Sequence, residues 1–212
     1  MLYALSTCEL MDRPDLWQAV HALRHRIFVE EMGWEALRRT DGLEIDQFDH
    51  EAAVHHLVMR NGELAGYQRM LPTTRPHLLT EVLTDLYEGT PPSGPNIFEL
   101  TRYAVAAPYR EGRWGLSSVG SELVAGFIEW GMTRGVDQVI IEFDPSWVLR
   151  ALQLQFLARP LGYQRTYGRQ QVVATLLGFD ANTLSVVRQK RNHHAPVLAH
   201  GEPQFIGYRK AS

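Results

Sequence analysis

Six charged side chains stand at positions where the hydrophobic pattern would not place them. They are Arg24 in a helical pattern, Asp46 and Asp49 in an acidic loop, Arg69 in a strand-like run, and Glu99 and Arg102 in a second strand-like run. Charges in such positions are costly to bury unless they are paired. We therefore expect either a structural ion-pair network or a site for a charged ligand.

The residue types suit a ligand that carries both a carboxylate and positive charges. Arginine binds a carboxylate through two parallel hydrogen bonds, while carboxylates suit an ammonium or a sulfonium. Aromatic rings such as Phe28 and Trp34 suit a cation or an adenine ring. A structural ion pair explains each charged residue taken singly, but the set together favours a binding site.

Four sequence blocks resemble the signature of the acyl-homoserine-lactone synthase (autoinducer synthase) family. They are LRHRIFVEEMGW, GLEIDQFDHEAAVHHLV, GYQRMLPTT and NIFELTRYAV, in the family order within residues 23–105. One block alone would be weak, whereas four in order are specific. The eight positions of the family pattern are all filled, by Arg24, Phe28, Trp34, Asp46, Asp49, Arg69, Glu99 and Arg102.

The resemblance implies an acyltransferase that makes a quorum-sensing signal. Such an enzyme moves an acyl group from a thioester to the amine of S-adenosylmethionine, and lactone closure then releases methylthioadenosine. Glu99 and Arg102 would be catalytic, with Glu99 taking the ammonium proton. The S-adenosylmethionine side would consist of Arg24, Phe28, Trp34, Asp46, Asp49 and Arg69. Both small molecules are substrates, so no cofactor and no metal are expected.

The same resemblance implies a fold similar to the N-acetyltransferase (GNAT) fold, an α/β/α sandwich around a mixed, splayed sheet. Residues three apart in a regular strand face opposite sides of the sheet. A bulge between Glu99 and Arg102 would turn both side chains toward one side.

Apolar periodicity predicts the elements that position these residues. Asn61-Gly62 between two strand-like runs is a strong hairpin signal. The alternation of helices and strands predicts a sheet covered by helices, in a single domain over residues 1–212. The predicted helices cover 12–34, 79–87, 117–135, 146–158 and 183–191, and the predicted strands cover 53–60, 63–71, 97–105, 138–143 and 172–177.

Bulk properties exclude several other classes of protein. The net charge is −3 and no run of Lys or Arg stands out, which argues against nucleic acid as a partner. The chain begins without a signal-peptide pattern and has no apolar stretch long enough for a membrane span. With Cys8 as the only cysteine, we expect a cytoplasmic protein. The histidine pairs 55–56 and 193–194 lack further residues at ligand spacing, so no metal site is expected.

The segment 109–118 has two interpretations of equal weight. It either binds the phosphopantetheine arm or pyrophosphate of coenzyme A, through Arg110, Arg113 and Gly115, or it is an ordinary loop that caps a helix.

The prediction of the acyl donor depends on two stretches, EFDPSWVLR and ARPLG. Both resemble the corresponding stretches of family members that use coenzyme A. Many members that make 3-oxo signals have Thr where this chain has Asp144 or Phe143. We expect Phe143, Asp144, Trp147 and Leu149 to line the acyl pocket. A short branched or aryl acyl-coenzyme A is favoured, and an acyl carrier protein docking on Arg150, Arg159, Arg165 and Arg169 is the alternative.

Two other functions fit the same fold. One is an N-acyltransferase that acts on a different amine, and the other is a non-catalytic acyl-thioester sensor. A sensor would have little reason to keep all eight polar and aromatic positions, so it ranks below an enzyme.

Overall fold

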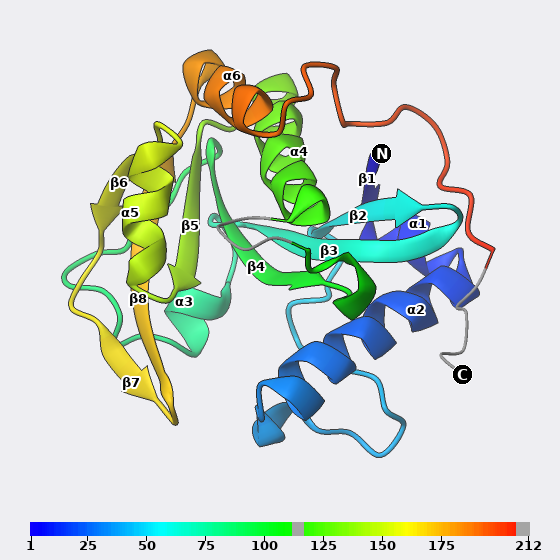
Figure 1. Ribbon diagram of the computed structural model, residues 1–212. Coiled ribbons are helices and arrows are strands. Elements are labelled where there is room, and N and C mark those ends of the chain that lie inside the picture. Colours follow the sequence, from blue (N-terminus) through cyan, green and yellow to red (C-terminus); the bar gives the residue numbers. More distant parts are fainter. Residues whose placement is uncertain (112–116, 207–212) are drawn as a thin grey trace. The chain divides into compact units, whose positions relative to one another are not determined.

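The predicted hairpin around Asn61-Gly62 is confirmed in the computed structural model, which describes residues 1–111 and 117–206 (Figure 1). Strand β2 is Val54–Arg60 and strand β3 is Glu63–Pro72. Asn61 and Gly62 both have positive φ, 51° and 78°. That pair of angles is typical of a type I′ turn, whose twist matches that of the flanking strands.

The chain divides into two units, each with its own hydrophobic core. Among the described residues, the first contains 1–69, 102–111, 117–126 and 196–206, and the second contains 70–101 and 127–195. Strands β3 and β4 and helix α4 each begin in one unit and end in the other. A single domain over residues 1–212 therefore stays a prediction.

In the first unit the strand order is β1-β2-β3-β4, with β1 antiparallel to β2. Its core joins one face of helix α2 to β2 and β3 through Leu16, Leu23, Leu57 and Tyr67. Its remaining elements are β1 (Leu2–Ser6), α1 (Thr7–Met11), α2 (Pro14–Arg24), the π-helical η1 (His25–Glu31), the 3-10 turns η2 (Glu35–Leu37) and η3 (Ala107–Tyr109), and the first half of α4 (Ser118–Arg134).

The predicted helix over residues 12–34 is present but changes its character after Arg24. Pro14 occupies the first turn of α2, where its missing N–H is tolerated. From His25 the chain continues as a π-helix, and the N–H of Met32 reaches back five residues to the carbonyl of Ile27 (2.9 Å). Such wider turns are rare and occur mostly near functional sites.

In the second unit the strand order is β4-β5-β8-β6, with β7 paired to β8. The β4–β5 pair is parallel and the others are antiparallel, so the sheet is mixed. The elements are α3 (Leu78–Glu81), β4 (Ile97–Val105), β5 (Gln138–Phe143), α5 (Ser146–Gln153), β6 (Leu157–Pro160), β7 (Arg165–Tyr167), β8 (Gln170–Gly178), α6 (Ala181–Lys190) and the second half of α4.

Two hydrophobic clusters stabilise the second unit. Leu79 and Leu86, in α3 and the segment after it, pack with residues of β4, β5 and β8. Three aromatic rings, Phe127, Phe156 and Phe179, form the other cluster, with ring centroids 5.6–6.5 Å apart. Edge-to-face and stacked contacts at these distances are favourable.

The pairing of β4 with β5 covers only the first part of β4. It runs from Ile97 opposite Gln138 to Glu99 opposite Ile140, while β5 continues alongside β8 to Phe143. Arg102 then has a φ of 56°, a left-handed conformation that bulged strand residues adopt and that is otherwise unfavourable for a residue with a side chain. This supports the predicted change in side-chain direction between Glu99 and Arg102.

The predicted helix over residues 146–158 is shorter in the structure. It ends at Gln153, and Gln155 takes a left-handed φ of 65°. The chain then enters β6, which pairs with β8. Among the described residues, no helix is both long and apolar enough to cross a membrane.

Candidate active site

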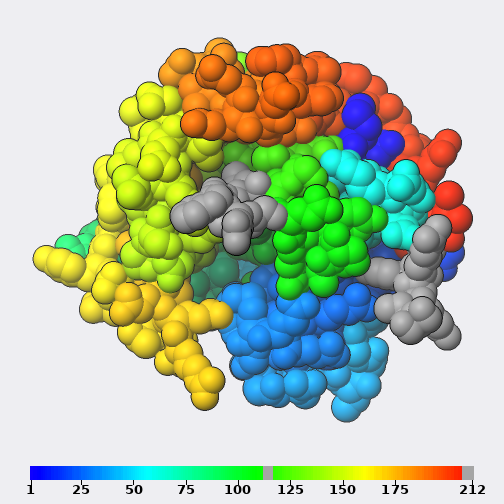
Figure 2. All heavy atoms as spheres, viewed as in Figure 1, coloured from blue at the N-terminus to red at the C-terminus, as the bar shows by residue number. Residues whose placement is uncertain are grey.

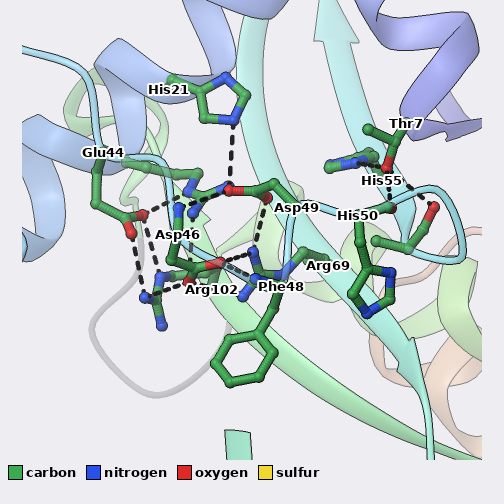
Figure 3. A network of polar contacts seen from close by, with 12 residues as sticks. Thr7, His21, Glu44, Asp46, Phe48, Asp49, His50, His55, Arg69 and Arg102 are labelled. Atoms are coloured by element: carbon green, nitrogen blue, oxygen red, sulfur yellow. Dashed lines mark hydrogen bonds and ion pairs between the residues drawn. The ribbon is translucent and has the colours of Figure 1, made fainter. Parts of the chain in front are cut away.

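Three arginines and three carboxylates of the first unit form one buried network (Figure 3). Every arginine donates hydrogen bonds to two carboxylates, and every carboxylate accepts from two arginines. The contacts are Arg24 to Glu44 (2.5 Å) and Asp49 (2.7 Å), Arg69 to Asp46 (2.6 Å) and Asp49 (2.7 Å), and Arg102 to Glu44 (3.1 Å) and Asp46 (2.7 Å).

Separate elements supply the two halves of this network. The arginines come from the end of α2, from β3 and from β4, so they are fixed by regular structure. The carboxylates come from the loop before β2. Hydrogen bonds to the loop's own side chains fix its conformation. The Phe48 N–H donates to the Asp46 carboxylate (2.9 Å), and the Asp46 N–H donates to the Asp49 carboxylate (3.0 Å). Such turns hold the acidic side chains toward the arginines.

The network keeps its carboxylates ionised. Burial alone would raise the pKa of Asp49, but the charges of Arg24 and Arg69 outweigh it and hold that pKa well below its ordinary value. The pKa values of Asp46 and Glu44 are also lowered, against burial, by their arginine partners. Three positive and three negative charges therefore balance inside the core, which is the condition for burying them.

An aromatic pair borders the network on the side of Arg102. The rings of Phe28 and Trp34 stack, with centroids 5.1 Å apart and planes at 23°. The Arg102 guanidinium carbon lies 5.5 Å from the Phe28 centroid and 5.9 Å from that of Trp34. These distances are within the range of cation–π attraction.

The end of the first helix sets the position of this aromatic pair. The Trp34 N–H donates to the Phe28 carbonyl (2.9 Å) across Gly33, which has a φ of 74°. A left-handed glycine just past the last turn is a common way for a helix to end. It brings the two rings together, with Phe28 buried and Trp34 half-buried.

Glu44 is a network member that the sequence reasoning missed. Its side chain is almost completely buried and binds both Arg24 and Arg102. The sequence reasoning counted Glu99 as the third carboxylate. The available signal was Glu44 two residues before Asp46, because three arginines in one cluster need three nearby carboxylates.

A second layer of neutral polar groups lies behind the network. The His55 ring contacts Tyr67 Oη at 2.7 Å and Thr7 Oγ1 at 3.0 Å. Burial lowers the pKa of His55 to about 3, so the ring is neutral at ordinary pH. Among the described residues, no group of three or more His, Cys, Asp or Glu is placed to hold a metal ion.

Glu99, in the second unit, has a different environment. Its buried carboxylate accepts the Leu78 N–H (2.8 Å) and the Leu79 N–H (2.7 Å) at the first turn of α3. His77 Nδ1 lies 3.0 Å from the same carboxylate. The free N–H groups of a helix start suit a negative charge, so α3 fixes both oxygens of Glu99 in place.

The predicted coenzyme A loop is only partly described. Arg113 and Gly115 lie outside the described residues. Arg110 donates to the Val105 carbonyl (2.6 Å) and to the Glu31 carboxylate (2.5 Å). Its role in binding a phosphate stays a prediction.

The predicted acyl-pocket residues lie along β5 and α5. Phe143 pairs with Val173 in the sheet, and the Asp144 carboxylate accepts the Ser146 N–H (2.9 Å) at the start of α5. Trp147 is half-buried, with the Arg150 guanidinium 4.7 Å from its ring. Leu149 is 62% exposed on α5, whose residues are yellow-green in Figure 2. The pocket itself stays a prediction.

Comparison with known proteins identifies the relatives of this chain. The family model described as autoinducer synthase matches residues 7–185. An isovaleryl-homoserine lactone synthase of Bradyrhizobium diazoefficiens is 32% identical over 192 residues, which cover 90% of this chain and 85% of that protein.

Solved structures agree with the sequence match. A structure of BjaI, described as a CoA-dependent acyl-homoserine lactone synthase, with SAM and isopentyl-CoA superposes with a TM-score of 0.84 at 29% identity. It covers 97% of this chain and 95% of the other. A putative N-acetyltransferase from Lactobacillus plantarum, 18% identical with a TM-score of 0.53, covers 84% of this chain and 99% of that one and shares the fold alone. The predicted GNAT-like α/β fold is thus confirmed.

Proposed function

Because this chain belongs to the autoinducer synthase family, we propose that it transfers the acyl group of an acyl-coenzyme A to the amine of S-adenosylmethionine. It is an acyl-homoserine-lactone synthase and hence an acyltransferase. The observation that carries the substrate assignment is the neutral arginine–carboxylate network bordered by the stacked rings of Phe28 and Trp34.

S-adenosylmethionine fits the accessible edge of that network. The side chain of Asp46 is 10% exposed and that of Arg102 is 5% exposed, whereas the side chains of Arg24 and Arg69 are fully buried. The substrate carboxylate would approach the guanidinium of Arg102, and its ammonium the carboxylate of Asp46. The rings of Phe28 and Trp34 would meet the sulfonium or the adenine ring.

The chemistry needs a base before the new bond can form. The α-ammonium attacks only after it loses a proton, and we assign the acceptor to Glu99. The thioester carbonyl becomes an oxyanion that backbone N–H groups of β4 would stabilise. The substrate carboxylate then attacks its own γ-carbon and expels methylthioadenosine, an intramolecular step that a bent, fixed substrate accelerates.

Support for coenzyme A as the donor comes from relatives and sequence. BjaI is described as CoA-dependent and its structure contains isopentyl-CoA, and the related Bradyrhizobium enzyme is an isovaleryl-homoserine lactone synthase. This chain also has Asp144 or Phe143 where many 3-oxo signal makers have Thr. A short branched or aryl acyl-coenzyme A follows as the proposed donor, used in the cytoplasm without cofactor or metal.

Two measurements on the purified protein test the proposal. Mass spectrometry should detect an acyl-homoserine lactone and equal amounts of methylthioadenosine, with no loss of rate in EDTA. Absence of both products would favour an acyltransferase for another amine or a sensor. Rates with one acyl group on coenzyme A and on a carrier protein should favour coenzyme A, and a clear preference for the carrier would refute the donor.

A further inference from the structure

Glu142 is a second carboxyl group beside Glu99 that the chemistry above does not use. In the parallel pairing of β4 and β5, neighbours in Figure 1, Glu99 lies opposite Ile140. Glu142 lies two residues further along β5 and therefore on the same face of the sheet as Ile140. Its carboxyl group comes within hydrogen-bonding reach of that of Glu99.

A hydrogen bond between these two carboxyl groups would require a proton. Two ionised carboxylates are acceptors only, so one of them must carry hydrogen for the bond to exist. Burial and the charge of Glu99 raise the pKa of Glu142 well above its ordinary value. Glu142 Oε1 is buried and has no hydrogen-bond partner among the described residues. Glu142 therefore has an oxygen that can still accept a hydrogen bond.

Glu99 alone is poorly suited to take a proton. Both of its oxygens already accept N–H groups from Leu78 and Leu79, and His77 contacts one of them. An incoming ammonium would therefore have to share oxygens that already accept these hydrogen bonds. A neighbouring carboxylate assists, because two like charges at close range favour uptake of one shared proton.

We propose that Glu142 is a positioning residue for the acyl transfer, which shares with Glu99 the proton that the pair removes from the substrate ammonium. The inference rests on the proposed function, in which Glu99 is the base. In this proposal, Glu99 and Glu142 on neighbouring strands together set the proton affinity of the base.

The protons balance as follows. The doubly ionised pair takes one proton from the ammonium, and the freed amine attacks the thioester carbon. The carbon–sulfur bond breaks with its electrons on sulfur, and the second excess proton on nitrogen neutralises the thiolate. The products are an amide and a thiol, and the shared proton leaves the pair for water.

Other titratable groups face this pair. His77 approaches Glu99 from the start of α3. Tyr167 approaches from β7, and burial, its hydrogen bond to Asp85 and the charge of Glu142 raise the pKa of Tyr167 to about 12, although the charge of Arg165 lowers it. Tyr167 is thus neutral at ordinary pH, which leaves His77 as the neighbour to control in the experiment.

The pH dependence of kcat for thiol release tests the proposal. In the wild type the rate should rise with pH as the shared proton is lost. Glu142→Gln keeps the shape and an N–H donor but removes the second charge. Its plateau should fall by about 10²-fold, the scale of general-base catalysis, and its acid limb should move to lower pH. Glu142→Asp retains a carboxylate. It should recover part of the high-pH plateau of kcat, and its acid limb should lie at the wild-type pH.

Two control variants and an infrared measurement that does not depend on activity complete the test. Glu81→Gln, an exposed change on α3, should leave rate and limb unchanged, and His77→Asn should leave the Glu142-dependent shift in place. Infrared titration of the wild type should show a protonated carboxyl band that disappears with rising pH along the rate limb. In Glu142→Gln the band should appear only at lower pH, in step with the shifted limb.

Two outcomes overturn the inference while lactone synthesis stands. One is a Glu142→Gln variant with a wild-type plateau or with an unmoved limb. The other is a wild type without the carboxyl band, a reading that needs no folded variant. Loss of the proposed function would appear separately, as absence of the lactone with the band intact.

Discussion

The arginine–carboxylate network of the first unit and the Glu99–Glu142 pair of the second show two uses of buried acidic residues. In the network, each carboxylate contacts two arginines, and the pKa values of Glu44, Asp46 and Asp49 are lowered. In the pair, one carboxyl faces another and the pKa of Glu142 is raised. Burial is common to both, so the sign of the neighbouring charge decides whether the pKa of the carboxyl group falls or rises.

This difference separates binding from proton transfer. A network of balanced charges holds its geometry and its ionisation across the ordinary pH range, as a site for a charged substrate requires. Two like charges at close range favour uptake of a shared proton, as a base for an ammonium requires. Variants in the network should therefore change stability and affinity, and variants in the pair should change turnover and its pH dependence.

Asp49→Asn should have the largest effect, on folding. It leaves Arg24 and Arg69 buried beside a neutral amide, and breaking a buried ion pair in this way costs about 3–5 kcal/mol. Urea unfolding should report the loss. Asp41→Asn is the control, because Asp41 pairs with Arg39 on the exposed surface and should leave the midpoint unchanged. A stable Asp49→Asn protein would show that the network contributes little to the fold.

Glu99→Gln should come next, with a turnover loss of about 10²-fold or more from the missing base. The sequence alone predicts nearly unchanged melting for this variant. The structure changes that expectation, because the Leu78 and Leu79 N–H groups bind different oxygens of Glu99 and an amide keeps only one of these acceptors. An unsatisfied buried donor costs about 1–3 kcal/mol. Single-turnover thiol release and thermal melting separate the two effects, and full activity would remove Glu99 from the mechanism.

Local patterns were sufficient to predict much of the fold. The Asn61-Gly62 hairpin, β4, α4 and β5 have strong periodicity or turn signals, and the structure confirms each within a few residues. The elements β1 and α1 were missed although Ser6 and Glu9 form a capping box at the start of α1, a signal readable in the sequence. The end of α5 had no such signal, because Gln155 takes a left-handed φ without being glycine.

The site was harder to predict than the fold. Periodicity locates Arg24, Arg69 and Arg102, but it does not say which carboxylates reach them. Glu44 lies in a loop without periodicity, and only the folded loop brings it to Arg24 and Arg102. Glu142 looked like an ordinary strand residue until the register placed it near Glu99. Contacts between residues distant in sequence were the missing information in both cases.

Trp34→Leu should have a moderate effect that is confined to the binding side. It removes the ring that stacks on Phe28 and faces Arg102, and aromatic contact with a cation contributes about 1–2 kcal/mol when desolvated. We expect KM for S-adenosylmethionine to rise about tenfold with kcat nearly unchanged. Trp147→Leu, in the second unit, is the control and should leave this KM at its wild-type value. A fall in kcat alone would contradict the assignment of Trp34 to substrate binding.

His55 should give the smallest effect, visible only as a slope of stability against pH. Its pKa is about 3 in the folded protein because burial disfavours the charged ring, against about 6.5 in an unfolded chain. Between these values the unfolded state binds the extra proton, so stability falls as pH falls. The loss should be on the order of 1 kcal/mol by pH 5.5. Urea unfolding of His55→Gln should show a shallower slope between pH 7 and 5.5 than the wild type, whereas His194→Gln, at an exposed site, should keep the wild-type slope. Equal slopes for both variants would mean that His55 is protonated in the fold and that the layer behind the network is not neutral.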